Sequence, residues 1–468
     1  MANYKLDPVQ IAALEASKGR NGFGFFMEMG LGKSLTALHE FQEGIKDGTT
    51  RMVIVSPNTF KGGWADEVDK HGMDLDAHVF QSGTYDSDAF LRRRYDRPPL
   101  LIINYEAIRS QAIFDKVLDW MGRKPTYIAF DESIQIKTHD ALQTKASIAL
   151  SRAAVMRRIL TGKPTAQGPH DLWGQMRAIG QLDGRNFYAF RGMFCRMGGF
   201  KNKQVIGSQN EDLLAQLIEP HVFRATKEDW LFSIPKVYTI REYEMTHEQR
   251  AQYRSMERDF VLWMNEDEFV TVDAAISKYE KLSQIQCGFI IDTDNESKVH
   301  VICESHRNPR IQTLLNVLDM EVPGKAIVVY VHRYAFEILE QSLKEYNPAW
   351  IKGGMKPDEI DEQKRRFNDD SSCRIILVQE RAGKYGHTLL GQSGANRCST
   401  TIFFENSYSL DDRSQIEDRN HRRGQDANSV DYIDLCGTSM DRNVIRALQR
   451  KESIFKAIFA HIRKATPT

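Results

Sequence analysis

Residues 27–38 read MEMGLGKSLTAL, and this stretch does most to decide the fold. It follows a short apolar run, Gly22–Met27, and it opens a segment, Ser34–Ile45, whose apolar side chains fall on one helical face. A strand, a glycine-rich turn and a helix in this order favour a turn whose backbone N–H groups bind phosphate. The residues expected to form this phosphate loop are Gly30, Leu31, Gly32, Lys33 and Ser34.

Each residue type in the loop suits a nucleotide phosphate. The two glycines allow a tight turn, the Lys33 ammonium can reach the β- and γ-phosphates, and the Ser34 hydroxyl can hold Mg²⁺. The loop is the shorter GxGK[ST] variant, because Met27 stands where the longer pattern has its first glycine. A glycine-rich turn with a surface lysine is the alternative, and the strand and helix on either side count against it.

Short apolar runs recur along the chain, rich in β-branched or aromatic residues and apolar on both faces. Such runs are typical of buried parallel strands. They cover Gly22–Met27, Met52–Ser56, Leu100–Asn104, Thr126–Phe130, Arg158–Thr161, Ala326–Val331, Ala349–Lys352, Arg374–Gln379, Thr401–Glu405 and Val430–Leu435. Because helical segments alternate with these runs, we predict an α/β fold with doubly wound parallel sheets.

The middle of the chain, from about residue 171 to residue 320, lacks this alternation and is predicted to be helical. Thr246 and Gln249 form a capping box at the start of one long helix. We therefore expect two lobes. Residues 1–235 form a first lobe that ends in a helical protrusion, and residues 236–468 form a second lobe that begins with one.

Composition limits the classes of function. Hydrophobic residues make up 41% and charged residues 27% of the 468 residues, which is typical of a globular protein. Lys+Arg and Asp+Glu both number 63, so any surface that binds nucleic acid must be a local patch. The apolar runs are too short to cross a bilayer, and the start lacks a secretory signal. Six cysteines without a CxxC pair favour a reduced, cytoplasmic compartment.

Asp131 and Glu132 follow a predicted buried strand, at the edge of the sheet where α/β proteins bind ligands. Asp131 can coordinate Mg²⁺, directly or through water, and Glu132 can polarise an attacking water. A solvated acidic turn explains this pair alone equally well. The phosphate loop in the same predicted sheet favours the catalytic interpretation.

The stretch SQIEDRNHRRGQ places Gln415, Arg419 and Arg422 at spacings of four and three residues. On a helix these side chains share one face, and Gly424 is a plausible C-cap. Two arginines held together suit the charge that develops on a transferred γ-phosphate. A solvated helix is the alternative, and it is favoured when this segment is considered alone.

The ordered set of motifs resembles the Swi/Snf-type DNA translocases of the superfamily-two helicase-like ATPases. IVSPNTFKGGWADEVDKH resembles the P-x-x-L-x-x-x-W-x-x-E-x-x-K block of that family, with Trp64 and Glu67 matching. LIINYEAIR is similar to its T-x-Y-E block, DESIQIKT to DEAHxIKN, and LTGKPTAQGPHDLW to LTGTPxxNxxxELW, the third motif. Residues 381–389 are similar to the fifth motif, and residues 415–425 to QxxDRxHRxGQ.

This resemblance implies two RecA-like lobes with helical protrusions and with ATP in the cleft between them. The first lobe would supply the phosphate loop and the acidic pair, and the second lobe would supply Arg419 and Arg422. The cofactors implied are ATP and Mg²⁺. The activity implied is movement along double-stranded DNA at the expense of ATP, without separation of its strands.

Some residues depart from the family's blocks. Ile134 stands where DEAH has its histidine, which normally links the state of the ATP to the third motif. Lys163 replaces a threonine in the third motif, and Tyr385 and His387 occupy the fifth motif where small or apolar residues are common. We expect hydrolysis to survive these changes, while its coupling to movement is open.

The resemblance suggests further contacts. Gln10 matches a glutamine that reads adenine in the family, although it can equally serve as the third helical residue of a capping box begun by Asp7. Lys61 and Arg109 match positions near the family's DNA track, and His332 and Arg333, which follow the first predicted strand of the second lobe, are further candidate DNA contacts. Considered alone, each of these four residues is better explained as a solvated surface residue. Trp64 is expected to pack in the core.

We expect an ATP-dependent translocase on double-stranded DNA that acts as a monomer, away from membranes, in the cytoplasm of a bacterial or phage-infected cell. Replication, recombination or repair proteins are further candidate partners. One alternative is a helicase that separates DNA or RNA strands, which shares the same ATP chemistry. The other is a nucleotide-gated DNA-binding protein with little productive hydrolysis.

Overall fold

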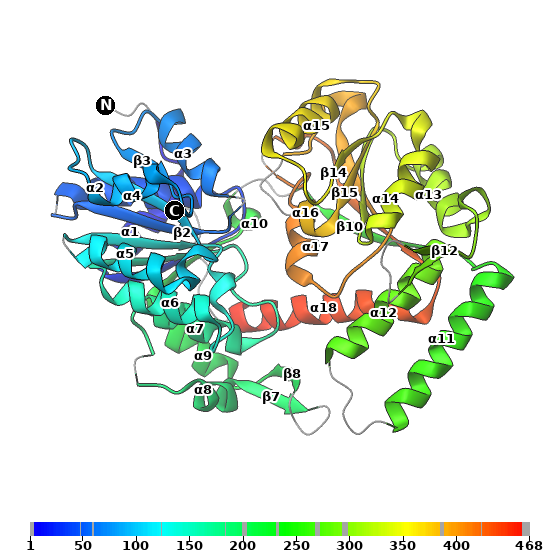
Figure 1. The fold of residues 1–468 in the computed structure, drawn as a ribbon, viewed down its shortest axis with the longest axis horizontal. Helices are drawn as coiled ribbons and strands as arrows, with labels where there is room; N and C mark the ends of the chain where they lie inside the picture. Colours follow the sequence, from blue (N-terminus) through cyan, green and yellow to red (C-terminus); the bar gives the residue numbers. More distant parts are fainter. Residues whose placement is uncertain are drawn as a thin grey trace. The chain divides into compact units, whose positions relative to one another are not determined.

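The computed structural model describes residues 4–46, 48–58, 60–122, 124–182, 184–198, 204–230, 234–266, 272–292, 298–383, 388–422 and 424–460. The chain separates into two compact units, one of residues 1–233 with 449–468 and one of residues 234–448 (Figure 1). The predicted boundary lies after residue 235, and the predicted second lobe includes the last segment of the chain. The boundary at residue 449 falls inside one continuous helix, α18 (Ser439–Ala460), so no loop or linker in the sequence marks it.

A seven-stranded sheet forms the centre of the first unit (Figure 1). Its strands lie in the order β3-β4-β2-β5-β6-β1-β9, and every neighbouring pair is parallel. The strands are β1 (Gly22–Met27), β2 (Arg51–Ser56), β3 (Asp76–Val79), β4 (Pro99–Asn104), β5 (Thr126–Asp131), β6 (Met156–Leu160) and β9 (Val222–Ala225). The carboxyl ends of β5, β6 and β1 are therefore neighbours along one edge of the sheet.

Helices cover both faces of this sheet, which explains why its strands are apolar on both sides. In β2, Val53 and Val55 pack into one core cluster, while Met52 and Ile54 pack into the other. One cluster includes α1 (Pro8–Ser17), α2 (Lys33–Lys46) and α3 (Lys61–Lys70). The other includes α4 (Tyr85–Arg92), α5 (Gln111–Gly122), α6 (Leu142–Arg152), α7 (Leu172–Ala178), α8 (Phe187–Phe194) and α9 (Glu211–Ile218).

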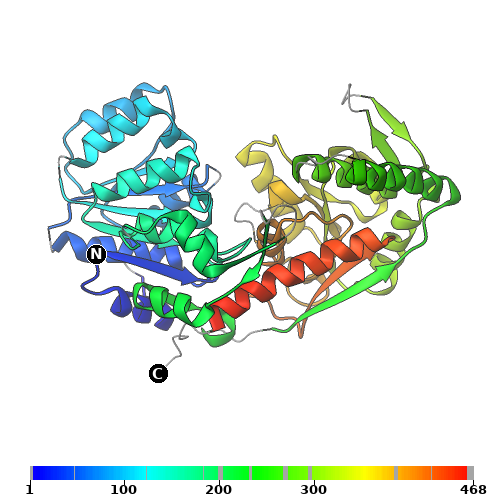
Figure 2. The same cartoon turned by 90° about the horizontal axis from the view of Figure 1, so that it is seen from below.

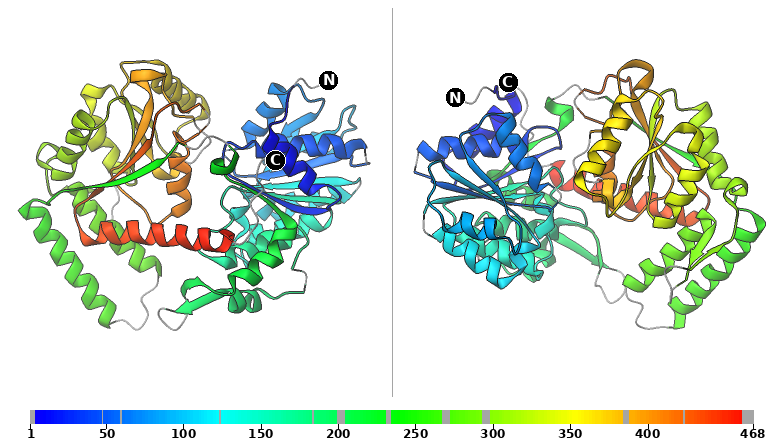
Figure 3. Two further views of the ribbon diagram at one scale, coloured as in Figure 1. Left: turned by 180° about the vertical axis from the view of Figure 1, so that it is seen from behind. Right: turned by 45° about the horizontal axis from the view of Figure 1, so that its top comes forward.

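The second unit contains a six-stranded parallel sheet in the order β10-β17-β16-β13-β15-β14. Its strands are β10 (Lys236–Glu242), β13 (Lys325–Tyr330), β14 (Ala349–Ile351), β15 (Ile375–Gln379), β16 (Cys398–Phe403) and β17 (Val430–Cys436). Helices flank this sheet on both sides (Figure 3). They include α13 (Pro309–Met320), α14 (Arg333–Ser342), α15 (Pro357–Asp369), α16 (Glu380–Gly383) and α17 (Leu410–Glu417).

The ten predicted strands are confirmed, so the chain has the expected α/β fold with two parallel sheets. The predicted capping box is also present, because Thr246 N–H donates to Gln249 Oε1 (3.1 Å) and Gln249 N–H donates to Thr246 Oγ1 (3.2 Å). It begins α11 (His247–Glu266), which α12 (Val272–Cys287) follows. Among the described residues, we find no helix with the length and apolar character needed to span a membrane.

The middle of the chain contains short strands as well as the predicted helices. One antiparallel hairpin, β7 (Cys195–Gly198) with β8 (Gln204–Ser208), extends from α8 in the first unit (Figure 1). A second hairpin, β11 (Phe289–Ile291) with β12 (Val299–Val301), projects beyond α11 in the second unit (Figure 2). Strands β9 and β10 also fall in this region. These strands are short or partly exposed, so they lack the continuous buried run that identified the others.

Candidate active site

The predicted phosphate loop connects β1 to α2. Gly30 and Gly32 have φ angles of 89° and 80°, in the left-handed region that favours glycine. A Cβ atom at Gly32 would lie 2.3 Å from Gln10 Nε2, so this position also lacks room for a larger residue. Leu31 N–H donates to the carbonyl oxygen of Glu28 (3.2 Å), and the Leu31 side chain is buried. The loop thus has the tight turn that the sequence predicts.

The two polar residues of the loop lie at the start of α2, where helical N–H groups favour anions. Lys33 Nζ donates to the carbonyl oxygen of Met27, the last residue of β1 (2.9 Å), so its ammonium lies across the loop. Ser34 is partly exposed as the second residue of the helix. This end of α2 therefore combines a positive side chain with the positive end of a helix dipole.

Gln10 braces this loop from α1. Its Oε1 atom accepts from Asp7 N–H (2.7 Å), and its Nε2 atom donates to the Gly32 carbonyl oxygen (3.1 Å). The residue is 3% exposed, and both ends of its amide contact the protein. Gln10 therefore has the capping-box role that the sequence allows.

Asp131 is the last residue of β5 and is 8% exposed. Its Oδ2 atom accepts from Trp64 Nε1 (2.9 Å) and Ser56 Oγ (3.1 Å), and its Oδ1 atom accepts from Glu132 N–H (3.0 Å). Burial raises the pKa of Asp131, whereas the Trp64 hydrogen bond and the charge of Lys33 lower it. The structure thus brings the acidic strand end within electrostatic reach of the phosphate loop.

Two side chains that the sequence pattern does not identify as part of the site hold this strand end. Trp64 is buried as expected, yet its indole N–H also fixes one oxygen of Asp131. Tyr105 is fully buried, and its hydroxyl donates to the carbonyl oxygen of Asp131 (2.7 Å). Both residues lie in blocks that resemble family motifs, but nothing in their spacing shows that they contact Asp131.

Glu132 has an unusual backbone conformation, with φ 45° and ψ 56°. A residue other than glycine in this left-handed region carries a strain of about 1–3 kcal/mol and persists only where its surroundings enforce it. Glu132 is partly exposed, whereas Asp131 beside it is buried. The two carboxylates therefore lie in different environments, as their separate predicted roles require.

The third motif follows β6, between the phosphate loop and the acidic strand end. A Cβ atom at Gly162 would lie 3.3 Å from Met29 N, so this turn packs closely on the phosphate loop. Lys163, which departs from the family's threonine, is partly exposed, and its N–H donates to Thr161 Oγ1 (3.2 Å). The other departures, Tyr385 and His387, lie outside the described residues.

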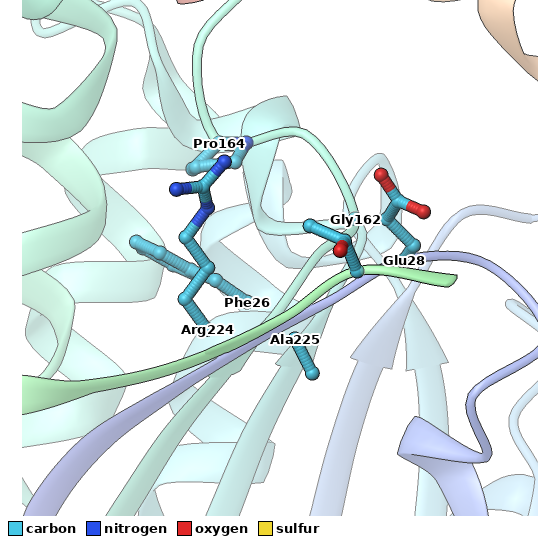
Figure 4. Close-up of a pocket in the computed structure, with 7 residues that line it drawn as sticks. Phe26, Glu28, Gly162, Pro164, Arg224 and Ala225 are labelled. Atoms are coloured by element: carbon cyan, nitrogen blue, oxygen red, sulfur yellow. The ribbon is translucent and has the colours of Figure 1, made fainter. Parts of the chain in front are cut away.

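A small pocket opens beside the loop, where β1, β6 and β9 end, and Figure 4 shows Arg224 extending toward Pro164. Burial lowers the pKa of Arg224, while Glu28 and Asp229 raise it. Glu28 N–H donates to the Ala225 carbonyl oxygen (3.0 Å), so the start of the loop is tied to β9. The pocket is lined by Phe26, Glu28, Gly162, Pro164, Arg224, Ala225 and Thr226.

The predicted helical face of Gln415, Arg419 and Arg422 does not form. Helix α17 ends at Glu417, so the two arginines lie in the turns beyond it. Beyond this residue the backbone tightens into turns: Arg419 N–H donates to the Ile416 carbonyl oxygen (2.9 Å), three residues back, where a continuing α-helix would bond four residues back. Gly424, with φ 95°, belongs to a later turn and is not the cap of this helix.

The arginines differ in exposure. Arg419 is fully buried in the second unit, whereas Arg422 is partly exposed. Burial lowers the pKa of Arg422, and the charge of Asp418 opposes this shift. Gln415 Nε2 donates to Asp411 Oδ1 (3.2 Å) within α17. Of this segment, Arg422 is therefore the residue best placed to meet a ligand.

Comparison with known protein families agrees with the order of these motifs. Residues 11–290 match the SNF2-related domain, and residues 309–424 match the helicase conserved C-terminal domain. The chain belongs to the SNF2-related family. It is a helicase-like ATPase, with the phosphate loop and acidic strand end inside the first match and Gln415, Arg419 and Arg422 inside the second.

Relatives of this SNF2-related chain differ in length. Putative protein p41 of Acyrthosiphon pisum secondary endosymbiont phage 1 is 23% identical over 414 residues, which cover 84% of this chain and 83% of that protein. The probable ATP-dependent DNA helicase CHR23 of Arabidopsis thaliana is 22% identical over 494 residues, covering 100% of this chain and 44% of that protein. The chain thus spans most of the phage protein and less than half of the plant protein.

Among solved structures, the SNF2-related chain is similar to the Sulfolobus solfataricus SWI2/SNF2 ATPase core in complex with dsDNA. The two are 20% identical with a TM-score of 0.44, and the match covers 98% of this chain and 94% of that chain.

The predicted DNA contacts have different surroundings in this SNF2-related protein. Lys61 Nζ donates to the Phe80 carbonyl oxygen (3.0 Å) and to Asn104 Oδ1 (3.2 Å), and burial lowers its pKa while Glu106 raises it. Arg109 and Arg333 are exposed, as a contact with a phosphate backbone requires.

The prediction for His332 does not fit the structure. Its Nδ1 atom lies 2.5 Å from Glu405 Oε1, and its side chain is 11% exposed. Glu405 also accepts from the backbone N–H groups of Val331 (2.8 Å) and His332 (3.1 Å). His332 therefore forms a buried pair that joins β13 to β16, and it is not a surface cation.

Proposed function

We propose that the protein is an ATP-dependent translocase on double-stranded DNA. One observation supports this proposal most strongly. The phosphate loop, the third motif and the acidic strand end follow β1, β6 and β5, which are adjacent strands of one parallel sheet. Ligands of α/β proteins bind at this edge. The charge of Lys33 also lowers the pKa of Asp131, which supports a single site shared by these two groups.

In the proposed reaction, the loop N–H groups and Lys33 bind the phosphates of ATP. Glu132 polarises the attacking water, because its carboxylate is partly exposed beside the fixed Asp131. Arg422 is proposed to stabilise the charge that develops on the transferred phosphoryl group, and Arg419 would have to leave its buried position to act with it. The products are ADP and inorganic phosphate, and the work of the reaction is movement along the duplex.

Ser34 and Asp131 are the residues that would hold Mg²⁺, which neutralises phosphate charge when it is bound. Hydroxyl and carboxylate oxygens are ligands that this hard cation prefers. A carboxylate has about four acceptor positions, and the described hydrogen bonds to Asp131 occupy three of them, which leaves one for the ion or its water. The residues present therefore fit the ion.

DNA is proposed as the substrate because the plant relative is named a probable ATP-dependent DNA helicase, and the double-stranded form is the one that the resemblance of the motifs implies. Equal numbers of basic and acidic residues limit the DNA contact to a local patch. The exposed Arg109 and Arg333 are the predicted contacts that remain open to such a partner, and Lys61 would have to exchange its internal contacts.

The proposal is tested by steady-state ATPase measurements without nucleic acid and with duplex DNA, single-stranded DNA or RNA. We expect weak turnover alone and the strongest stimulation with duplex DNA. Absence of turnover in all four reactions would favour the nucleotide-gated DNA-binding protein. Strongest stimulation by single strands, together with opening of a forked substrate, would favour a strand-separating helicase.

The role of Glu132 is tested by Glu132→Gln, which keeps the shape of the side chain and removes its basic carboxylate. We expect hydrolysis to fall by roughly 10²–10⁴, the usual contribution of a general base, while ATP still binds. Lys33→Ala is the contrasting variant, because it should weaken ATP binding itself. Fluorescent-nucleotide titration and ATPase rates separate the two. Near wild-type hydrolysis by Glu132→Gln would remove Glu132 from the mechanism.

A further inference from the structure

Gln175 of α7 joins two segments of the candidate site that are far apart in sequence. Ser133 Oγ, directly after the acidic pair, donates to Gln175 Oε1 (2.8 Å). Gln175 Nε2 donates to the carbonyl oxygen of Pro164 in the third motif (2.6 Å) and to that of Asp171 (2.9 Å). Ser133 and Gln175 are both fully buried. One amide therefore connects the acidic strand end to the third motif in the protein interior.

The backbone packs tightly at the same place. A Cβ atom at Gly174 would lie 2.1 Å from the Ile136 carbonyl oxygen, so α7 approaches the short 3₁₀-helix η2 (Ser133–Ile136) more closely than a larger residue would allow. This close approach places Gln175 within reach of Ser133. The contact between the two segments is thus set by both backbone and side chains.

The third-motif turn is held at its other end as well. Asp171 Oδ2 accepts from the N–H groups of Ala166 (2.7 Å) and Gln167 (2.7 Å). Gly162, at the start of the turn, packs on Met29, the residue directly before the phosphate loop. Contacts therefore run from the phosphate loop through the third-motif turn to the acidic strand end, and Gln175 makes the contact between the last two.

Glu132 needs such a link because its left-handed backbone is strained. On its N-terminal side, the Tyr105 hydroxyl fixes the Asp131 carbonyl oxygen. On its C-terminal side, the bond between Ser133 and Gln175 holds the next residue. Loss of that bond would let the backbone of Glu132 relax and would redirect its carboxylate.

We propose that Gln175 is a positioning residue for ATP hydrolysis. Through Ser133 it keeps Glu132 in the left-handed conformation, and through Pro164 it ties that conformation to the third motif. The inference rests on the proposed function, since it concerns the group assigned there as the base. Ile134, which stands where the DEAH block has its histidine, is buried and has no polar atom with which to bond to the third motif. In this protein Gln175 would supply that polar connection.

The test compares Gln175→Leu with wild type in ATPase activity at saturating duplex DNA. We expect kcat to fall roughly 10- to 100-fold, because misplacing a reacting group by about 1 Å costs up to about 100-fold. The KM for ATP should change by less than about threefold, since the phosphate loop itself is intact. Ser133→Ala removes the same bond with a smaller change in volume, and it decides the question should Gln175→Leu not fold.

Gln249→Leu is the matched control. Gln249 is also fully buried, and its Oε1 atom accepts from Thr246 N–H while its Nε2 atom donates to the carbonyl oxygens of Ile285 (3.1 Å) and Gln286 (3.0 Å). It belongs to the second unit, whereas the acidic strand end belongs to the first. At a temperature where all variants are folded, the control should keep the wild-type kcat. An equal fall in kcat for both glutamine variants would show a merely structural role and overturn the proposal.

The double variant Ser133→Ala with Gln175→Leu tests the link itself. If the two residues act through one bond, its kcat should not fall below that of the worse single variant by more than about twofold. Losses that multiply would show independent effects and contradict the link. An inactive wild type would overturn the proposed function and this inference with it, whereas an active wild type with an equally active Gln175→Leu would overturn the inference alone.

Discussion

Buried charges hold the phosphate-loop helix in place. Arg158 is fully buried, and its Nε and Nη2 atoms donate to the two carboxylate oxygens of Glu40 (2.8 and 2.7 Å). The Tyr127 hydroxyl donates to Glu40 Oε2 (2.7 Å), and Ser17 Oγ donates to Oε1 (2.5 Å). Glu40 lies on α2, so these bonds fix the helix that begins at Lys33 to β5 and β6.

Glu40→Ala should therefore strongly destabilise the first unit. The substitution leaves the Arg158 guanidinium buried without its carboxylate, which costs roughly 3–5 kcal/mol of unfolding free energy. This loss is measured as the difference between the two proteins in the free energy of unfolding of the first unit, obtained from urea titration. Glu43→Ala on the same helix is the control, because the exposed pair of Glu43 with Lys46 contributes about 0–1 kcal/mol. Similar losses in the two variants would contradict this account of the helix.

At the scale of secondary-structure elements, the sequence predicts the interior of each sheet better than its edges. Strands that are buried on both faces, such as β2 and β13, form continuous apolar runs. The missed strands β3, β9 and β10 all lie at sheet edges. In β10, Val237 and Tyr238 remain 40% and 48% exposed, so a search for runs buried on both faces passes over this strand. An edge strand pairs with a neighbour on one side only and can leave side chains exposed, so its sequence lacks a continuous apolar run.

The same limit applies to the candidate site. The phosphate loop and the acidic pair are predictable, because neighbouring residues in the sequence make the turn and the strand end. Trp64, Tyr105 and Gln175 contact Asp131 or Ser133 across 67, 26 and 42 residues, and no local pattern specifies these contacts. The sequence also predicts that α17 continues through Arg422, whereas the helix ends at Glu417, and no residue pattern in this stretch marks that end.

The buried pair of His332 and Glu405 should make the second unit sensitive to pH. Burial lowers the pKa of His332, but the charge and the hydrogen bond of Glu405 raise it by more, so the net pKa is raised. Of the more distant charges, Glu280 raises this pKa and Arg310 lowers it. Burial raises the pKa of Glu405, while His332 and Arg310 bring it down to about 2. The Cys287 thiol also contacts Glu405 (3.1 Å). The imidazolium thus stabilises the fold below its unfolded pKa, and this contribution is lost as pH rises through the raised value.

His332→Gln should accordingly lower the Tm most at about pH 6 and less at about pH 9, because the wild-type imidazolium is lost as pH rises. Glu405 stays ionised across this range, since its pKa lies near 2. Thermal unfolding of both proteins at several pH values measures the difference. His300→Gln is the control, because that side chain is 56% exposed. A loss of Tm that is the same at every pH would contradict the assignment of the pair.

At the scale of the whole molecule, the residues proposed to act on ATP are divided between two units. Lys33, Asp131 and Glu132 belong to the first unit, and Arg419 and Arg422 belong to the second. If both sets of residues act on one nucleotide, a substitution in the second unit must change the rate at which ATP bound to the first unit is hydrolysed. If these arginines have no catalytic role, the same substitution should leave the hydrolysis rate unchanged.

Arg422→Ala tests this division of labour. With saturating duplex DNA, we expect kcat to fall by roughly 10³, as for the loss of an arginine that stabilises a transferring phosphoryl group. Affinity for duplex DNA should change little, since the residue acts on the transition state. Arg442→Ala is the control, because that arginine pairs with Glu242 at the surface of the second unit. A change of less than about threefold, under 1 kcal/mol of barrier, would remove Arg422 from the mechanism.

The central claim is that ATP hydrolysis moves the protein along duplex DNA without separating its strands. Release of a fluorescent third strand from a DNA triplex measures this movement directly, and a second dye on the duplex reports whether its own strands stay paired. We predict release of the third strand by the wild type with ATP, no release by Glu132→Gln, and a duplex that remains intact. Duplex-stimulated hydrolysis without release of the third strand, or separation of the duplex strands, would contradict the account.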